Sequence, residues 1–335
     1  MKAVLVRDFG PFEHVSVSDV EDPLPAAGEV VVDVIAAEAN YPDILVIEGK
    51  YQIKPPLPFS PGKAAAGRIA ALGAGVEGLA VGDAVAVQVE YGAYAEKVRV
   101  RAESCFRMPD GMPFDKAAAL GLVYQTAWFA LKERAGFKPG ESVLVLGASG
   151  GIGVASVQLA KALGACRVIA GVIGDSNAEV ARRAGADHVV DLGAPDLRER
   201  LKSEVASVTG RRGVDVVIDP VGGAANAAAL RAMAWCGRLV VIGFASGEIP
   251  AIPANYLLVK NIAVTGLQWS DYRDRTPGRV REAQAEIFDL YTRGHIDPLI
   301  SRKVKLEDFK VALAMLRDGQ AQGKIILDVQ PVTGV

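Results

Sequence analysis

The stretch VLVLGASGGIG, residues 143–153, decides the fold of this 335-residue chain. Its four apolar residues predict a short buried strand, its glycines predict a tight turn, and the apolar spacing of Gly153–Leu163 predicts a helix directly behind the turn. A helix that starts at such a turn offers free backbone N–H groups and the positive end of its dipole, and both attract anionic phosphate. The stretch therefore predicts a site for the pyrophosphate of a dinucleotide.

The glycines of this turn have separate tasks. Gly150 lets the backbone approach a pyrophosphate closely, and Gly153 lets the helix pack tightly against the strand. Ala148 stands at the first glycine position of the common G-x-G-x-x-G pattern, so the chain carries a relaxed form of it. A tight turn without a ligand is the alternative, and the surrounding alternation of strands and helices favours the dinucleotide. The turn residues expected to contact the cofactor are Ala148, Ser149, Gly150, Gly151, Ile152 and Gly153.

Strands and helices alternate beyond about residue 122. The predicted strands are Ser142–Leu146, Arg167–Val172, His188–Val190, Val214–Asp219, Arg238–Gly243 and Ile262–Gly266. Alanine-rich helical stretches such as Ala178–Ala184 and Ala224–Met233 lie between several of them. Near-continuous apolar strands joined by helices predict an α/β fold, a doubly wound parallel sheet of the Rossmann type.

The first part of the chain has a different texture, with short strands separated by proline and glycine clusters. The predicted strands are Met1–Arg7, Val30–Ala36, Ala66–Leu72, Ala84–Val89 and Ala95–Val100. This spacing predicts a compact, β-barrel-like domain. Near the other end of the chain, Pro277–Arg293 and Glu307–Arg317 are predicted helices, and we expect the last strand, Lys324–Val329, to return to the first domain.

Composition limits the classes of function. A chain of 335 residues is too long for one core, so two domains are expected. The formal net charge of -2 gives no reason to expect nucleic acid or an anionic membrane surface as a partner. The three cysteines form no C-x-x-C pair, and neither a secretory signal nor a long apolar run is recognisable, so a cytoplasmic protein is expected.

The choice of dinucleotide depends on the end of the second strand of the sheet. An acidic residue there bonds the ribose 2'-hydroxyl in NAD-binding proteins, but residues 169–174, IAGVIG, end without one. Asp175 follows slightly later, and a solvated loop charge is the alternative role for it. Asn177, Arg182 and Arg183 are candidate partners of a 2'-phosphate, although both arginines also fit an exposed helix face. NADP is therefore favoured as the cofactor, in the form of NADPH, and NAD remains possible.

Several short fragments, taken together, resemble one family. They are Asn40-Tyr41-Pro42-Asp43, Pro58-Phe59-Ser60-Pro61-Gly62, Gly92-Ala93-Tyr94-Ala95-Glu96, Tyr124-Gln125-Thr126-Ala127, the glycine-rich turn, Asp219-Pro220-Val221-Gly222-Gly223 and Gly323-Lys324. In this order and spacing the chain resembles the medium-chain dehydrogenase/reductase superfamily, in its zinc-independent, zeta-crystallin-like quinone oxidoreductase branch. The resemblance implies a GroES-like catalytic domain built from residues 1–122 and 273–335, and a Rossmann dinucleotide-binding domain over residues 123–272.

Zinc-containing relatives differ from this chain at the metal ligands. They carry a cysteine where Asn40 stands, a His-Glu pair at Lys63 and Ala64, and a second cysteine near Leu122. None of these residues is a thiolate or an imidazole here, so no catalytic metal is expected. Without a Lewis acid, an electron-poor acceptor is easier to reduce than an alcohol is to oxidise. A quinone or an α,β-unsaturated carbonyl compound is such an acceptor.

The resemblance also assigns roles to single residues. Asn40 and Thr126 match positions that face the nicotinamide and its ribose, Tyr51 matches a residue of the acceptor pocket, and Tyr41 is a second possible donor. Packing is the alternative role for both tyrosines, and turn formation is the alternative for Asn40. Further expected cofactor contacts are Val221, Gly243, Phe244, Ala245, Leu267, Gln268, Trp269 and Lys324. Members of the family form dimers in which two Rossmann sheets pair edge to edge through the sixth strand, so a homodimer is expected. Burial in such a dimer interface is the alternative role for Trp269.

The resulting hypothesis is an NADPH-dependent reductase that acts on a small electrophilic acceptor. An enoyl-thioester (acrylyl-type) reductase is the nearest alternative, for which Lys50, Lys54 and Lys63 offer a basic rim. A protein that binds NADPH without efficient turnover is a further alternative. Departures from the family at Ala64, Asn177 and Leu192 affect catalysis and cofactor choice in any of these cases.

Overall fold

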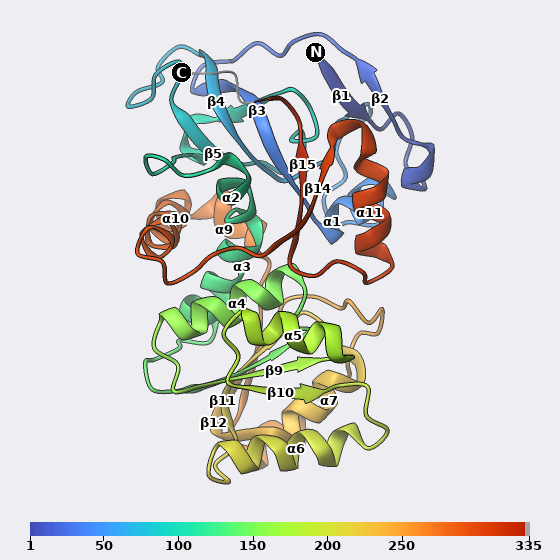
Figure 1. Ribbon diagram of the computed structural model, residues 1–335, viewed down its shortest axis with the longest axis vertical. Coiled ribbons are helices and arrows are strands. Elements are labelled where there is room, and N and C mark those ends of the chain that lie inside the picture. Colours follow the sequence, from blue (N-terminus) through green and yellow to red (C-terminus); the bar gives the residue numbers. More distant parts are fainter. Residues whose placement is uncertain (332–335) are drawn as a thin grey trace. The chain divides into compact units, whose positions relative to one another are not determined.

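The computed structural model describes residues 1–331, which form two compact units (Figure 1). The first unit comprises Met1–Leu122, Tyr272–Thr292 and the segment that begins at Ile300, and the second comprises Val123–Asp271 and Arg293–Leu299. The sequence-based division instead left Tyr272 in the second domain and Arg293–Leu299 in the first. The chain therefore alternates between the units in five segments rather than in the three that the sequence predicts.

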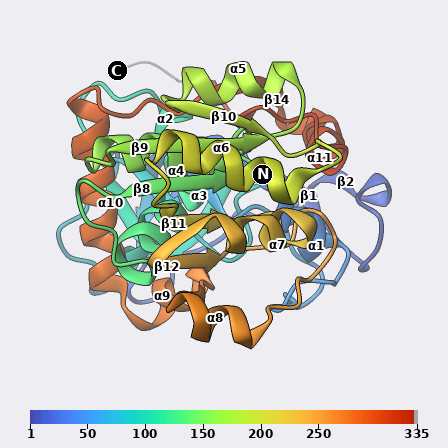
Figure 2. The ribbon, with the colours of Figure 1, turned by 90° about the horizontal axis from the view of Figure 1, so that it is seen from below.

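The second unit contains a parallel sheet. In the described chain its strands are β8 (Ser142–Leu146), β9 (Arg167–Val172), β10 (His188–Asp191), β11 (Val214–Asp219), β12 (Met233–Val241) and β13 (Ala263–Gly266). Their order is β10-β9-β8-β11-β12-β13, which Figure 2 shows in this sequence from β10 to β12. The direction of winding reverses between β8 and β11, and a sheet of this kind binds its ligand at the carboxyl ends of those two strands.

Helices cover both faces of this sheet. Helices α4 (Gly151–Ala162) and α5 (Asp175–Arg183) pack on one face, and α6 (Leu197–Val208) and α7 (Gly223–Ala232) pack together on the other (Figure 1). The central strands β8, β9 and β11 are buried almost throughout and are mostly apolar, because helices cover both of their faces. Helix α6 was not predicted, since only Leu201 and Val205 of its residues are buried and its sequence is mostly polar.

The first unit is built on a mainly antiparallel sheet. Its strands are β3 (Glu29–Ala39), β4 (Ala64–Leu72), β5 (Ala84–Gln88), β6 (Lys97–Arg101), β7 (Cys105–Arg107), β14 (Ile300–Lys305) and β15 (Lys324–Asp328), and β1 (Lys2–Leu5) pairs separately with β2 (Ser16–Asp19). Strand β15 pairs antiparallel with β3. The last strand therefore returns to the sheet formed by the start of the chain, as predicted.

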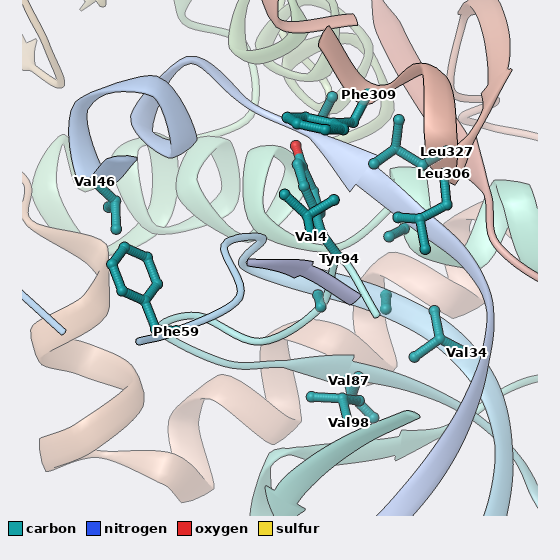
Figure 3. Close-up of a cluster of buried hydrophobic side chains, with 14 of the residues drawn as sticks. Val4, Val34, Val46, Phe59, Val87, Tyr94, Val98, Leu306, Phe309 and Leu327 are labelled. Atoms are coloured by element: carbon teal, nitrogen blue, oxygen red, sulfur yellow. The ribbon is translucent and has the colours of Figure 1, made fainter. Parts of the chain in front are cut away.

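Aliphatic and aromatic side chains fill the core of the first unit. Figure 3 shows Tyr94 among Val4, Leu327 and Phe309. Phe309 opens helix α11 (Phe309–Arg317), which lies against β14 and β15 (Figure 1). Other helices of the chain are α1 (Tyr41–Ile47), α2 (Phe114–Ala119), α3 (Leu122–Phe129), α8 (Ala254–Lys260), α9 (Trp269–Arg275) and α10 (Pro277–Thr292), with short 3-10 turns at Phe12–His14, Ala102–Ser104 and Leu306–Asp308 and a π-helical turn at Ala130–Arg134.

Helix α1 corrects the expectation of strands and turns alone before residue 122. It has only seven residues, with Pro42 in its first turn, where the missing N–H of proline costs no hydrogen bond. Cysteines suit the role of small buried apolar residues, but only Cys105 is buried, whereas Cys166 and Cys236 are exposed. No helix in residues 1–331 is long and apolar enough to cross a membrane.

We expect Gly153→Ala to destabilise the second unit. A Cβ atom at this position would lie 2.2 Å from the carbonyl oxygen of Gly147 and 2.6 Å from Cα of Ala148, so α4 would have to move away from the turn. Overpacking of this kind costs roughly 1–3 kcal/mol, and contacts to backbone are the least able to yield. Urea unfolding should show the loss, while the matched Gly150→Ala variant, whose Cβ meets nothing nearer than 3.6 Å, should unfold like the original protein.

Candidate functional site

The glycine-rich turn joins β8 to α4 in the geometry that its sequence predicts. Gly147 has a φ of 62°, in the left-handed region that favours glycine, and Gly150 is the extended residue that caps α4. A side chain at Gly153 would collide with the turn, whereas the space next to Gly150 is open. The turn therefore keeps the N-terminus of α4 free of side chains, which is what a phosphate group needs.

Two further loops lie at the same edge of the sheet. A side chain at Gly147 would meet Val221, which follows β11. The loop after β12 is tied to the loop after β11, since the N–H groups of Ala245 and Ser246 donate to the carbonyl oxygens of Pro220 and Val221. The structure thus gathers the turn, Val221 and the Gly243–Ala245 segment, all of which the sequence assigned to the cofactor.

The residues assigned to a 2'-phosphate are less well placed. Asn177 lies in the first turn of α5, just beyond the end of β9, and its side-chain amide donates a 2.9 Å hydrogen bond to the carbonyl oxygen of Ile173. Arg182 lies in the last turn of the same helix. Arg182 lies seven positions after Asp175, the first residue of α5. At 1.5 Å per residue this places the Arg182 backbone roughly 10 Å along the helix from its start at the carboxyl end of β9.

Residues that follow β13 are mostly buried. Leu267 and Trp269 are buried, Gln268 is exposed, and the Leu267 N–H donates to the carbonyl oxygen of Val241. The indole Nε1 of Trp269 is buried without a hydrogen-bond partner among the described residues. Thr126, on α3, is also buried.

In the first unit, Asn40 belongs to a buried polar network. The Lys324 ammonium group donates to Asn40 Oδ1 at 2.6 Å and to the Ala39 carbonyl oxygen at 3.3 Å, and it pairs with Glu38 Oε2 at 2.8 Å. Glu38 Oε1 accepts the backbone N–H of Leu122 at 3.0 Å. Two hydrogen bonds and one ion pair therefore hold the Lys324 ammonium group inside the first unit, and a contact between Lys324 and the cofactor stays a prediction.

Asn40 also begins α1, where Asp43 completes the cap. The Asn40 N–H donates to Asp43 Oδ2 at 2.8 Å, and the Tyr94 hydroxyl donates to the same oxygen at 2.9 Å. Burial raises the pKa of Asp43 to about 6, against the opposing charge of Lys63 and these two hydrogen bonds. Burial, together with the Asp43 carboxylate, holds the pKa of Tyr94 well above its usual range.

A second ion-pair network lies around Lys63. Its ammonium group pairs with the Glu90 carboxylate and donates to the Glu90 carbonyl oxygen, and Arg273 pairs with the other Glu90 oxygen at 3.0 Å. The same ammonium group lies 4.5 Å from the ring centroid of Tyr51. One face of the Tyr51 ring is therefore occupied by a cation. Tyr41, by contrast, is exposed.

Two of the positions at which the resemblance places metal ligands in zinc-containing relatives, Asn40 and Lys63, are bonded to other side chains. Asn40 binds Lys324, and Lys63 binds Glu90. Within residues 1–331 no group of three or more His, Cys, Asp and Glu side chains could hold a metal ion.

Sequence reasoning missed the acidic and phenolic partners in this unit. Glu38, Glu90 and Tyr94 were assigned no role, although Glu38 is the one charged residue in the apolar run Val34–Ala39. The predicted strand Val30–Ala36 ended two residues before Glu38, whereas β3 continues to Ala39. A carboxylate inside a buried strand implies a buried cation, so the longer strand is what reveals the need for a partner. The identity of the cation, Lys324, was not available from local sequence because 284 residues separate it from Asn40.

Comparison with known proteins follows the two units. Residues 26–110 match the family model described as the alcohol dehydrogenase GroES-like domain, and residues 151–285 match the model described as zinc-binding dehydrogenase. The chain is 35% identical over 304 residues to the quinone oxidoreductase-like protein 2 homolog of Nematostella vectensis, covering 90% of this chain and 82% of that protein.

Solved structures are similar over almost the whole chain. A mycobacterial protein in complex with NADPH has a TM-score of 0.90 and 30% identity, over 99% of this chain and 100% of that one. The quinone oxidoreductase of Escherichia coli, also solved with NADPH, has a TM-score of 0.89 and 29% identity over the same shares of the two chains.

We expect Asp43→Asn to stabilise the protein more at pH 7.5 than at pH 4.5. The folded protein binds the Asp43 proton more tightly than the unfolded chain does, whose aspartates titrate near pH 4, so the carboxyl group's contribution falls as pH rises from about 4 to 6. Asparagine carries no charge and avoids this loss, a relative gain of about 2 kcal/mol in the free energy of unfolding. Urea unfolding of both proteins at the two pH values measures it, with the exposed Asp110→Asn as control. An equal effect at both pH values would contradict the raised pKa.

Proposed function

Because the chain belongs to the medium-chain dehydrogenase/reductase superfamily, in its quinone oxidoreductase branch, we propose that it is an NADPH-dependent reductase that transfers a hydride to a quinone or an α,β-unsaturated carbonyl compound. The observation that carries the proposal is the open N-terminus of α4 beside Gly150, at the switch point of the parallel sheet. Two similar structures were solved with NADPH, which supports the same cofactor here.

The second unit holds the cofactor in this proposal. Backbone N–H groups at the start of α4, from Gly151 to Gly153, bind the pyrophosphate, because no side chain occupies the space beside Gly150. Val221 and the Gly243–Ala245 loop border the same edge of the sheet and contact the remainder of the dinucleotide. When bound, NADPH supplies the hydride.

The first unit acts on the acceptor. Asn40 offers a buried amide donor, and Tyr51 is the second residue that the resemblance assigns to the acceptor pocket. A hydrogen bond to the acceptor oxygen stabilises the negative charge that grows there as hydride arrives. The oxygen then takes a proton, for which Tyr51 and the exposed Tyr41 are the candidate donors. Asn40 and Lys63 stand at metal-ligand positions and bind other side chains, so we propose that no zinc takes part.

Preference for NADPH over NADH rests on the end of β9. No acidic residue lies on the strand itself, and α5 begins directly behind Gly174 with Ser176 and Asn177 in its first turn. Asp175 is the opposing feature, because its charge repels a 2'-phosphate. We therefore propose a preference for NADPH rather than an absolute requirement.

The enoyl-thioester alternative loses its main support. A basic rim for coenzyme A needs free ammonium groups, but Lys63 is buried against Glu90, and Lys50 pairs with Glu48 at 2.9 Å. Lys54 alone of the three has no such pair among the described residues. A quinone or enone, which carries no phosphate, fits these pairings better.

We further propose that the protein is a homodimer joined through the second unit. Strand β13 has one strand neighbour in the described chain, β12, so its other edge presents unpaired backbone groups. Helix α8, which lies at that border of the sheet in Figure 2, exposes Leu258 and Val259 by 79% and 77%. Adjacent apolar side chains exposed to this degree are typical of a surface that a partner covers.

The proposed reaction predicts that NADPH absorbance falls when a quinone is added. The acceptor panel should contain 1,4-benzoquinone, 9,10-phenanthrenequinone, an alkyl enone and crotonyl-coenzyme A, each with NADPH and with NADH. We expect faster oxidation of NADPH, the highest rates with the quinones, and no effect of a zinc chelator. A preference for the thioester would favour the enoyl-thioester reductase, and binding of NADPH without oxidation of it by any acceptor would favour the non-catalytic alternative.

The matched variant for this assay is Gly150→Val. Its backbone angles suit any residue and its side chain meets open space, so the fold should survive while the valine occupies the phosphate position. We expect NADPH binding, followed by fluorescence titration, to be lost together with activity. Unchanged NADPH affinity in a folded variant would refute the assignment of the turn.

The dimer proposal predicts that Leu258→Glu with Val259→Glu yields a monomer. Both side chains are exposed, so the fold of the subunit should not change, but two charges would have to be buried in the interface. Size-exclusion chromatography with light scattering distinguishes the two states. A dimer that persists in the double variant would place the interface elsewhere.

A further inference from the structure

The side-chain amide of Asn40 has an unpartnered donor. Asn40 is 4% exposed, and its Nδ2 atom has no hydrogen-bond partner within residues 1–331. A buried N–H without an acceptor costs roughly as much free energy as a lost hydrogen bond. A group that is kept in this state inside a candidate site therefore points to an acceptor supplied by a ligand.

The orientation of this amide is fixed by its neighbour. The Lys324 ammonium group lies 2.6 Å from the other end of the amide. An ammonium group only donates, so the atom that faces it must be the oxygen, and Nδ2 must face the other way. The free end of Asn40 is thus a donor, and its ligand must present an oxygen acceptor.

Strand register explains why three side chains meet here. Ile325 pairs with Ala39 across β15 and β3, which sets Lys324 opposite Asn40, and Ile326 pairs with Glu38. Side chains two residues apart on a strand share a face of the sheet, so Glu38 and Asn40 lie on the same side. Glu38 is fully buried, and its Oε1 atom accepts the Leu122 N–H. This hydrogen bond fixes the carboxylate so that its Oε2 atom faces the Lys324 ammonium group.

We propose that Glu38 and Lys324 are positioning residues that hold the Asn40 side chain with its Nδ2 donor free for an uncharged oxygen acceptor of the bound ligands. Glu38 keeps the ammonium group in place, Lys324 fixes the Asn40 oxygen, and Asn40 alone touches the ligand. The acceptor is a hydroxyl or carbonyl oxygen, which either NADPH or the electron acceptor can supply. This inference rests on the proposed function.

A purely structural role for the ion pair is the competing explanation. Lys324 and Glu38 also join β15 to β3, and a buried charge whose partner is removed destabilises a protein. The double variant Glu38→Gln with Lys324→Met removes both charges together and so leaves no unpaired ion. Asn40→Asp has the same shape and keeps an oxygen for Lys324, but it replaces the amide donor by a carboxylate oxygen that only accepts.

The test is a cycle of variants assayed with NADPH and a quinone. We expect Asn40→Ala, and separately the double variant, to lower kcat/KM by about tenfold, the value of one hydrogen bond. The triple variant, which combines Asn40→Ala with Glu38→Gln and Lys324→Met, should lose no more kcat/KM than Asn40→Ala alone, because the ion pair acts through Asn40. Losses that multiply would show that the pair supports only the structure and would overturn the proposal.

Two further readouts keep the proposal testable. If the double variant does not fold, Asn40→Asp decides, because unchanged kinetics in that folded variant would mean that the donor has no ligand. Loss of NADPH affinity in fluorescence titration places the acceptor oxygen on the cofactor, whereas a changed KM for the quinone or a changed kcat places it on the electron acceptor.

The exposed Lys305→Met on β14 is the control and should behave like the original protein. If the original protein reduces no acceptor, the proposed function fails, but the NADPH titrations still test whether the pair positions Asn40.

Discussion

The close contact between α4 and the glycine-rich turn is the constraint on which the second unit depends. The space between Gly153 and the Gly147 carbonyl oxygen is too small for a single methyl group. This contact sets where α4 starts, and therefore where its free N–H groups lie relative to the carboxyl ends of β8 and β11. The loops after β11 and β12 are bonded to each other at the same edge, so the site follows from how the sheet is wound.

The first unit follows a different rule, because its candidate site is made of side chains in pairs. Charged groups that are almost fully buried need partners, and Glu38 and Lys63 have theirs in Lys324 and Glu90. Burying such pairs contributes little stability, since desolvation offsets most of the attraction between the charges. Their retention in an apolar unit is better explained by the groups that they orient, namely the Asn40 amide and the Tyr51 ring.

This difference explains which features the sequence could predict. Strands β8, β9 and β11 were predicted at their observed bounds, because a fully buried parallel strand is an uninterrupted apolar run and the glycines of the turn act locally. Short α1 was missed, because seven residues carry too little periodic signal. The partners of Asn40, Asp43 and Lys63 were missed as well, since those contacts join strands and loops that are distant in sequence.

The two rules also differ in how the units tolerate substitution. Recognition by backbone N–H groups depends on the absence of side chains, so Ala148 can replace a glycine in the turn where its buried methyl group fits, and Gly153 has no substitute. Recognition by paired side chains depends on both members, so a single change at Glu38, Lys324 or Asn40 leaves a buried group without its partner. Substitutions at these positions of the first unit must therefore be accompanied by substitutions of the bonded partners.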